Sequence, residues 1–111
     1  MEDVLAKAAD LGRTLCAAPE FRALRDAEAA VMAAPDSVTL AEALGTLHRR
    51  RAADQAAGKP MDAATAEAIE KITAAVALDD RLQALSRAQQ AFQALVDRVN
   101  GAMLAELRPA K

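Results

Sequence analysis

Apolar side chains recur every three or four residues along the last third of the chain. They stand at Leu78, Leu82, Leu85, Phe92, Val96, Val99, Met103 and Leu107, with one interruption at Gln89. This spacing predicts a long helix whose apolar stripe packs against other helices over about four heptads. Such a helix extends about 45 Å, which is more than a small chain covers easily by itself. We therefore expect it to be the spine of the fold and the place where two copies meet.

We predict that a dimer or partner interface follows this stripe. Its expected members are Leu85, Gln89, Phe92, Val96, Val99 and Met103. Gln89 allows two interpretations. A buried polar residue in such a stripe can set the register of a dimer, at a cost in stability. Alternatively, Gln89 lies at the end of the contact and is exposed.

The first helix is expected over residues 3–18, where apolar residues follow the same helical spacing. Asp3 lies near the positive end of its dipole, which is favourable. Gly12 stands in the middle of this helix, where glycine costs about 1 kcal/mol relative to alanine. The expected explanation is the close approach of a neighbouring backbone. Cys16 lies beside the stripe and is expected to be a small buried or half-buried hydrophobic residue.

A second and a third helix follow. Pro19 suits the first position of the second helix, which is expected to run to about Ala34. Pro35 should stop this helix, and residues 36–37 should form a turn. The spacing of Thr39 and the glutamate three residues later matches a capping box, which predicts the start of the third helix.

The end of the third helix and the boundaries of the last two are marked by glycine, proline and aspartate. Gly58 and the proline two residues later should end the third helix. Asp62 can cap the fourth helix and Asp79 the spine helix, although one continuous helix over residues 63–107 is also compatible with the pattern. Residues 109–111 are expected to be frayed.

The predicted fold is thus an all-α bundle of four to five helices in a single domain, residues 1–111, expected to be dimeric. Hydrophobic residues make up 53% of the chain, but more than half of them are alanine, and Phe21 and Phe92 are its only aromatic residues. Alanine favours helix but buries little area. The resulting core should be thin, and thin cores in small chains are commonly completed by a second subunit.

Charge and hydropathy argue for an ordinary cytoplasmic protein. The formal net charge is −2, with 27% charged residues of both signs, which is not typical of a protein that binds polyanions. No apolar run approaches the ~18 residues that a membrane span needs. The acidic start of the chain lacks the basic region of a signal peptide.

The sequence contains few side chains that could take part in catalysis or bind a metal ion. His48 is the only histidine, and the sequence offers it no catalytic partner. Glu-x-x-His pairs, glycine-rich phosphate loops and nucleophile elbows are absent. Cys16 alone can form neither an internal disulfide nor a cysteine-only metal site. We expect no catalytic residue, no metal site and no cofactor.

The densest positive cluster consists of Arg49, Arg50 and Arg51, which follow His48. Consecutive residues cover a full turn of a helix and so do not form one patch. Sequence-specific RNA binding usually adds stacking aromatic residues, which are missing near this cluster. We therefore interpret it as a solvated or partner-facing surface and keep direct RNA contact as the alternative.

Four segments carry a resemblance to a known family. They are residues 18–24 (APEFRAL), 32–36 (MAAPD), 55–58 (QAAG) and 85–92 (LSRAQQAF), the last continuing to Leu95 and to residues 99–100. In their order and spacing they resemble the YlbF/YheA/YmcA family of small helical bacterial proteins, over residues 4–107. Ala34 departs from the pattern, because the family usually has an acidic or amide residue there. The chain looks most similar to the short, cysteine-poor, YheA-like branch.

The resemblance implies a dimeric helical protein without enzymatic activity. Relatives act as regulators in competence, sporulation and biofilm pathways, some in a complex that associates with ribonuclease Y and influences RNA maturation. Certain relatives bind iron–sulfur clusters through cysteines. Cys16 stands alone here, so cluster binding is not expected.

Together these features predict a non-enzymatic, dimeric adaptor or regulator that works through protein–protein contacts, with a ribonuclease-associated complex as the partner that the resemblance suggests. The alternatives are an RNA-binding protein that uses the arginine cluster, an enzyme or metal protein, and a helical secretion chaperone with one dedicated client.

Overall fold

The chain folds into five helices, which a computed structural model describes over residues 1–108. They are α1 (Glu2–Cys16), α2 (Pro19–Met32), α3 (Pro35–Ala56), α4 (Ala63–Leu78) and α5 (Asp80–Leu107). No strand occurs in these residues. The all-α prediction and the long C-terminal helix are therefore confirmed, whereas the expected fraying of residues 109–111 lies outside the described part.

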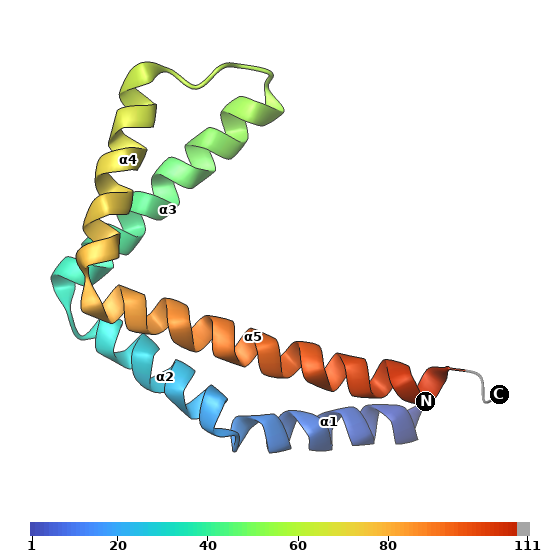
Figure 1. Cartoon of the computed structure of the whole chain (residues 1–111). Coiled ribbons are helices and arrows are strands. Elements are labelled where there is room, and N and C mark those ends of the chain that lie inside the picture. Colours follow the sequence, from blue (N-terminus) through green and yellow to red (C-terminus); the bar gives the residue numbers. More distant parts are fainter. Residues whose placement is uncertain (109–111) are drawn as a thin grey trace.

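The helices form two arms that meet at an elbow (Figure 1). In the longer arm, α1 and α2 follow one another along the length of α5, so that the beginning of the chain lies near the end of α5 (Figure 1). In the shorter arm, α3 and α4 run side by side as a helical hairpin. The molecule extends 56 × 37 × 26 Å, which is elongated for a chain of this size.

The long arm is held together by the packing of α2 on α5. Val31 of α2 and Ala88 of α5 are buried. The rings of Phe21 and Phe92 lie 5.4 Å apart between centroids, at an interplanar angle of 57°. This tilted arrangement is one that aromatic pairs prefer. The two aromatic residues of the chain thus join α2 to the middle of the spine helix.

The start of α3 lies five residues earlier than the capping-box pattern predicted, since the N-cap is Ala34 and not Thr39. Ala34 is extended (φ −116°, ψ 99°), and Pro35 occupies the first turn of α3. Residues 36–37 are therefore helical and do not form a turn, and Pro35 begins α3 after α2 has already ended at Met32. Thr39 is not a cap: its hydroxyl donates a hydrogen bond of 3.0 Å to the carbonyl oxygen of Pro35. Proline at a first helical position has the φ that the helix needs, and this preference prevails over the capping-box pattern.

The boundary signals at Gly58, Asp62 and Asp79 are confirmed, whereas α1 and α2 each end two residues before the predicted ends at residues 18 and 34. Gly58, directly after α3, has φ +70°, a left-handed conformation that favours glycine. Asp62 caps α4 by accepting a hydrogen bond of 2.7 Å from the backbone N–H of Thr65. Asp79 separates α4 from α5 with an extended backbone, so these are two helices. Leu78 consequently ends α4 and does not begin the spine helix.

Two expectations for α1 are wrong within the single chain. Cys16 is exposed, not buried or half-buried, because α1 is so little covered within the chain that none of its residues is buried. A Cβ atom placed on Gly12 would meet nothing within 4 Å. The close approach of a neighbouring backbone, which was expected to explain Gly12, therefore does not occur within the single chain.

Candidate interaction surfaces

A partly buried hydrogen-bond network holds the elbow between the arms. Ser37, in the first turn of α3, is only 1% exposed. Its hydroxyl donates to the carboxylate of Asp79, with distances of 2.8 Å to Oδ2 and 3.0 Å to Oδ1. The same carboxylate accepts a hydrogen bond of 2.9 Å from the backbone N–H of Leu82. Asp79 therefore caps α5 and ties its first turn to α3.

These hydrogen bonds hold the pKa of Asp79 below its ordinary value. The backbone N–H of Leu82 is the largest cause and the hydroxyl of Ser37 the next, because both donate to the charged carboxylate. The unfolded chain takes up the proton at a higher pH than the folded chain does. The network therefore stabilises the fold fully above the ordinary carboxyl pKa of 3.8, and the stabilisation is lost as the pH falls through the lower folded pKa.

We expect Ser37→Ala to lower the free energy of unfolding by about 1.5 kcal/mol, because it removes a hydrogen bond to a charged group. In Asp79→Asn, the difference in stability from the wild type should shrink as the pH falls from 5 to below 3. Urea denaturation followed by circular dichroism at several pH values measures both effects. The effect of Ser37→Ala should be much smaller in the Asp79→Asn background, and full additivity of the two substitutions would contradict the network.

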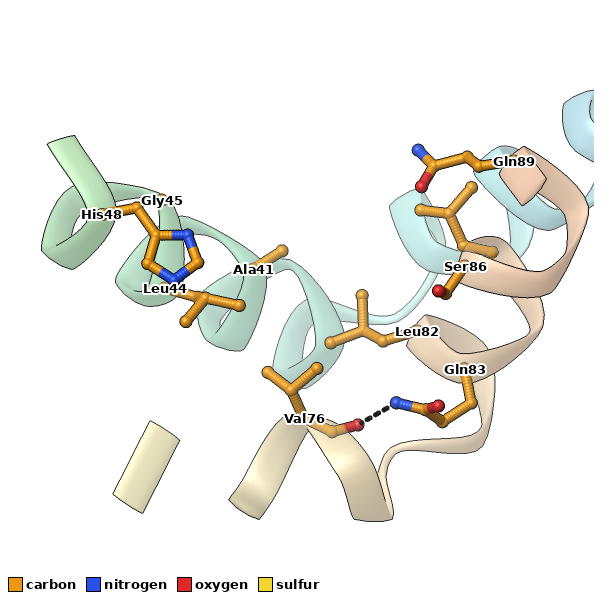
Figure 2. A pocket seen from close by; sticks show the side chains of 10 residues that line it. Ala41, Leu44, Gly45, His48, Val76, Leu82, Gln83, Ser86 and Gln89 are labelled. Carbon is orange, nitrogen blue, oxygen red and sulfur yellow. Dashed lines mark hydrogen bonds between the residues drawn. The ribbon is translucent and has the colours of Figure 1, made fainter. Parts of the chain in front are cut away.

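A cleft of about 380 Å³ opens beside this network, on the inner side of the elbow. Its walls come from α3 on one side and from the first turns of α5 on the other, with Val76 of α4 below (Figure 2). Leu44, Val76, Leu82 and Leu85 supply apolar surface, and His48, Gln83, Ser86 and Gln89 supply polar groups. The side-chain amide of Gln83 donates to the carbonyl oxygen of Val76 at 3.1 Å (Figure 2). We call this region the elbow cleft.

The elbow cleft brings together few groups that could do chemistry. His48 is the one titratable side chain among the described residues that line it. General acid–base catalysis by a histidine needs a second group that orients the imidazole or shares its proton. No group of three or more His, Cys, Asp or Glu side chains placed to hold a metal ion occurs within residues 1–108. The cleft thus offers contact surface and hydrogen bonds but no catalytic pair.

The predicted α5 stripe is divided among three environments. Leu85 and Gln89 line the elbow cleft, with Gln89 exposed. Phe92 packs on Phe21 of α2. Val96 and Val99 are half-buried, and Met103 is exposed near the end of the helix. Part of the stripe is therefore used within the chain, while Gln89 and Met103 remain exposed.

A second apolar groove, of about 490 Å³, lies between α1 and the last turns of α5. The side chains that line it are Val4, Lys7, Ala8, Leu11, Leu15 and Met103, together with Gly12. We call it the α1 groove. No residue of α1 is buried, although the helix has a clear apolar side. The sequence pattern had predicted a helix with apolar residues along one side here, but it could not show that this side stays uncovered in the single chain.

The arginine cluster lies on the exposed surface of α3. Arg49, Arg50 and Arg51 are all exposed on the second half of α3. Arg49 donates a hydrogen bond of 3.2 Å to the hydroxyl of Thr46 on its own helix. Arg51 faces a shallow depression of about 280 Å³ that it shares with His48 and two further α3 residues. Because the three residues are consecutive on α3, their side chains leave the helix in directions about 100° apart.

The fold and these surfaces define a small all-helical protein that leaves extended apolar faces open. Within residues 1–108, no helix is both long and apolar enough to cross a membrane. Residues 4–108 match the family described as control of competence regulator ComK, YlbF/YmcA, and the chain belongs to this family. The match confirms the resemblance inferred from the four sequence segments, while placement near the YheA-like branch stays a prediction. A comparison with curated proteins found no match.

Proposed function

We propose that the protein is a non-enzymatic, homodimeric adaptor that regulates other proteins through protein–protein contacts. The observation that carries this proposal is the excess of surface on the single chain. Its accessible surface is 8493 Å², whereas a compact monomer of this mass exposes about 5,800 Å². Roughly 2,600 Å² per chain is therefore available beyond the needs of a compact fold, and stable homodimers bury about 2,000 Å² or more in total.

The character of this surface supports association. The buried apolar residues are only Val31, Leu82 and Ala88, while nine large apolar residues among the described ones are exposed. The exposed ones are Met1, Val4, Leu5, Met32, Met61, Leu78, Met103, Leu104 and Leu107. Large exposed apolar areas mark protein–protein interaction sites. Of the predicted interface on α5, the end that includes Met103 is the part most open to a second copy.

The regulatory part of the proposal is supported by the family to which the chain belongs. Its description, control of the competence regulator ComK, concerns regulation and names no reaction. A helical adaptor fits this description, because it acts by bringing proteins together and needs only surface. A complex that contains a ribonuclease is the partner class that the sequence resemblance suggests, and it is the first to be tested.

Sedimentation velocity and a tagged pull-down test the proposal. At micromolar concentration, sedimentation should give a molecular mass twice the 11.6 kDa of the single chain. A protein partner should remain bound when the native extract is treated with nuclease. A matched variant, with alanine at Arg49, Arg50 and Arg51, should capture the same partner. A monomer at every concentration would contradict the homodimer. Partners that are lost with nuclease and with the alanine variant would favour the RNA-binding alternative.

A further inference from the structure

The α1 groove is wider than the space between two packed helices. The axes of packed helices lie 8–10 Å apart, which brings many of their Cα atoms well within 8 Å of one another. No Cα atom of α1 lies within 8 Å of a Cα atom of α5, although the two helices lie in the same arm (Figure 1). The two helices are thus close enough to share a groove but too far apart to close it.

The side chains along the α1 groove are exposed or only half-buried in the single chain. Val4 is 64% exposed, and Leu5, which follows it outside the groove lining, is 61% exposed. Leu11 and Leu15 are half-buried, and Met103 on the opposite wall is exposed. Burying apolar area contributes about 25 cal/mol per Å², so a partner that covers these side chains gains appreciable free energy.

Gly12 supplies the second observation. It lies inside α1, where alanine is more favourable by about 1 kcal/mol. A Cβ atom at this position would meet nothing within 4 Å, so no contact within the chain requires a glycine. Glycine permits the close approach of another backbone, and the open side of the α1 groove is where such a backbone can come from.

We propose that the α1 groove is the homodimer interface, and that α1 of a second copy lies antiparallel across it. This rests on the homodimer of the proposed function and assigns its surface. A second copy is the occupant that the excess surface supports, since a closed two-fold interface removes the same apolar patch from water on both chains.

The sequence of α1 fits an antiparallel pair with its two-fold axis at Ala8. In that register Val4 of one copy lies opposite Gly12 of the other, so that a large side chain meets a position without one. Leu5 likewise lies opposite Leu11. The pairing also sets the two helix dipoles in opposite directions.

The charged side chains of α1 stay outside this contact. Its first turn carries Glu2 and Asp3, and its last turn carries Arg13. At about 100° per residue, Asp3 and Arg13 lie about 140° around the helix from Ala8, on the side away from the partner. Arg13 pairs there with Asp10 of its own helix, and this exposed pair contributes little to stability.

Gly12→Leu tests the interface, with Gly101→Leu as the matched control. Both glycines are in helices, and at both a Cβ atom would meet nothing within 4 Å. Leucine favours helix over glycine, so both variants should keep their helical circular dichroism. Gly12→Leu should raise the dimer dissociation constant by about tenfold or more, because its side chain fills the space that the partner helix needs. Gly101→Leu should leave the dissociation constant unchanged.

Arg13→Glu provides a second control. Because Arg13 lies on the side of α1 away from the partner, this variant should leave the dimer dissociation constant unchanged when it is measured by sedimentation. A wild-type dimer whose dissociation constant is not changed by Gly12→Leu would overturn the α1 assignment alone. A monomeric wild type would overturn the homodimer itself.

Discussion

Replacement of Leu82 by alanine is expected to lower the free energy of unfolding by about 3 kcal/mol, as truncation of a buried leucine commonly does. Leu82 is 8% exposed and lies in the first turn of α5, where its side chain meets the walls of the elbow cleft (Figure 2). The substitution leaves a cavity where the two arms meet. Because small domains are stable by only 5–15 kcal/mol, it should remove a large share of the total stability.

Leu78→Ala is the matched control for Leu82→Ala. Leu78 lies one helical turn earlier in the same sequence pattern, yet it is 85% exposed at the end of α4. Its truncation should change the free energy of unfolding by no more than about 0.5 kcal/mol. Urea denaturation at one fixed protein concentration measures both variants, since association adds to the apparent stability. Equal losses at the two positions would show that the elbow is not packed as described.

Phe92→Ala is expected to lower the free energy of unfolding by about 2–3 kcal/mol, less than for a fully buried phenylalanine because its side chain is half-buried. The lost contact is the tilted stacking on Phe21, with ring centroids 5.4 Å apart. The guanidinium of Arg25 lies 5.9 Å from the centroid of the Phe21 ring, so Phe21 keeps one favourable contact after the substitution. The same denaturation experiment measures the loss.

A double-mutant cycle separates this ring contact from simple loss of apolar area. Phe92→Leu keeps most of the volume and should cost less than about 1.5 kcal/mol. The coupling energy between Phe21→Ala and Phe92→Ala should be about 0.5–1.5 kcal/mol. A coupling energy near zero would mean that α2 and α5 are held together by other contacts.

Most of the helix boundaries were predictable because they depend on local chemistry. Asp62 and Asp79 cap α4 and α5 through hydrogen bonds to a backbone N–H three residues later. Gly58 adopts a left-handed φ that other residues avoid. The start of α3 was misplaced because two local signals competed, and the proline signal prevailed over the capping box at Thr39.

The candidate surfaces were less predictable, because a periodic stripe shows which side of a helix is apolar and not what covers it. Phe92 and Met103 belong to one stripe, yet Phe92 packs on Phe21 while Met103 borders an open groove. Ser37 had been placed in a turn and carries no sequence signal for the elbow. Its partner Asp79 lies 42 residues away in the chain, and only the meeting of the two arms brings the pair together.

The sequence by itself thus determined the helices, their order, most of their ends and the family, because helical period, capping and glycine or proline geometry act over a few residues. Only the tertiary structure decided that α1 leaves a groove beside α5, that Gly12 and Cys16 are exposed, and that a buried serine joins the two arms. These features depend on distances between segments that are far apart in the chain, and a pattern along the chain contains no such distances.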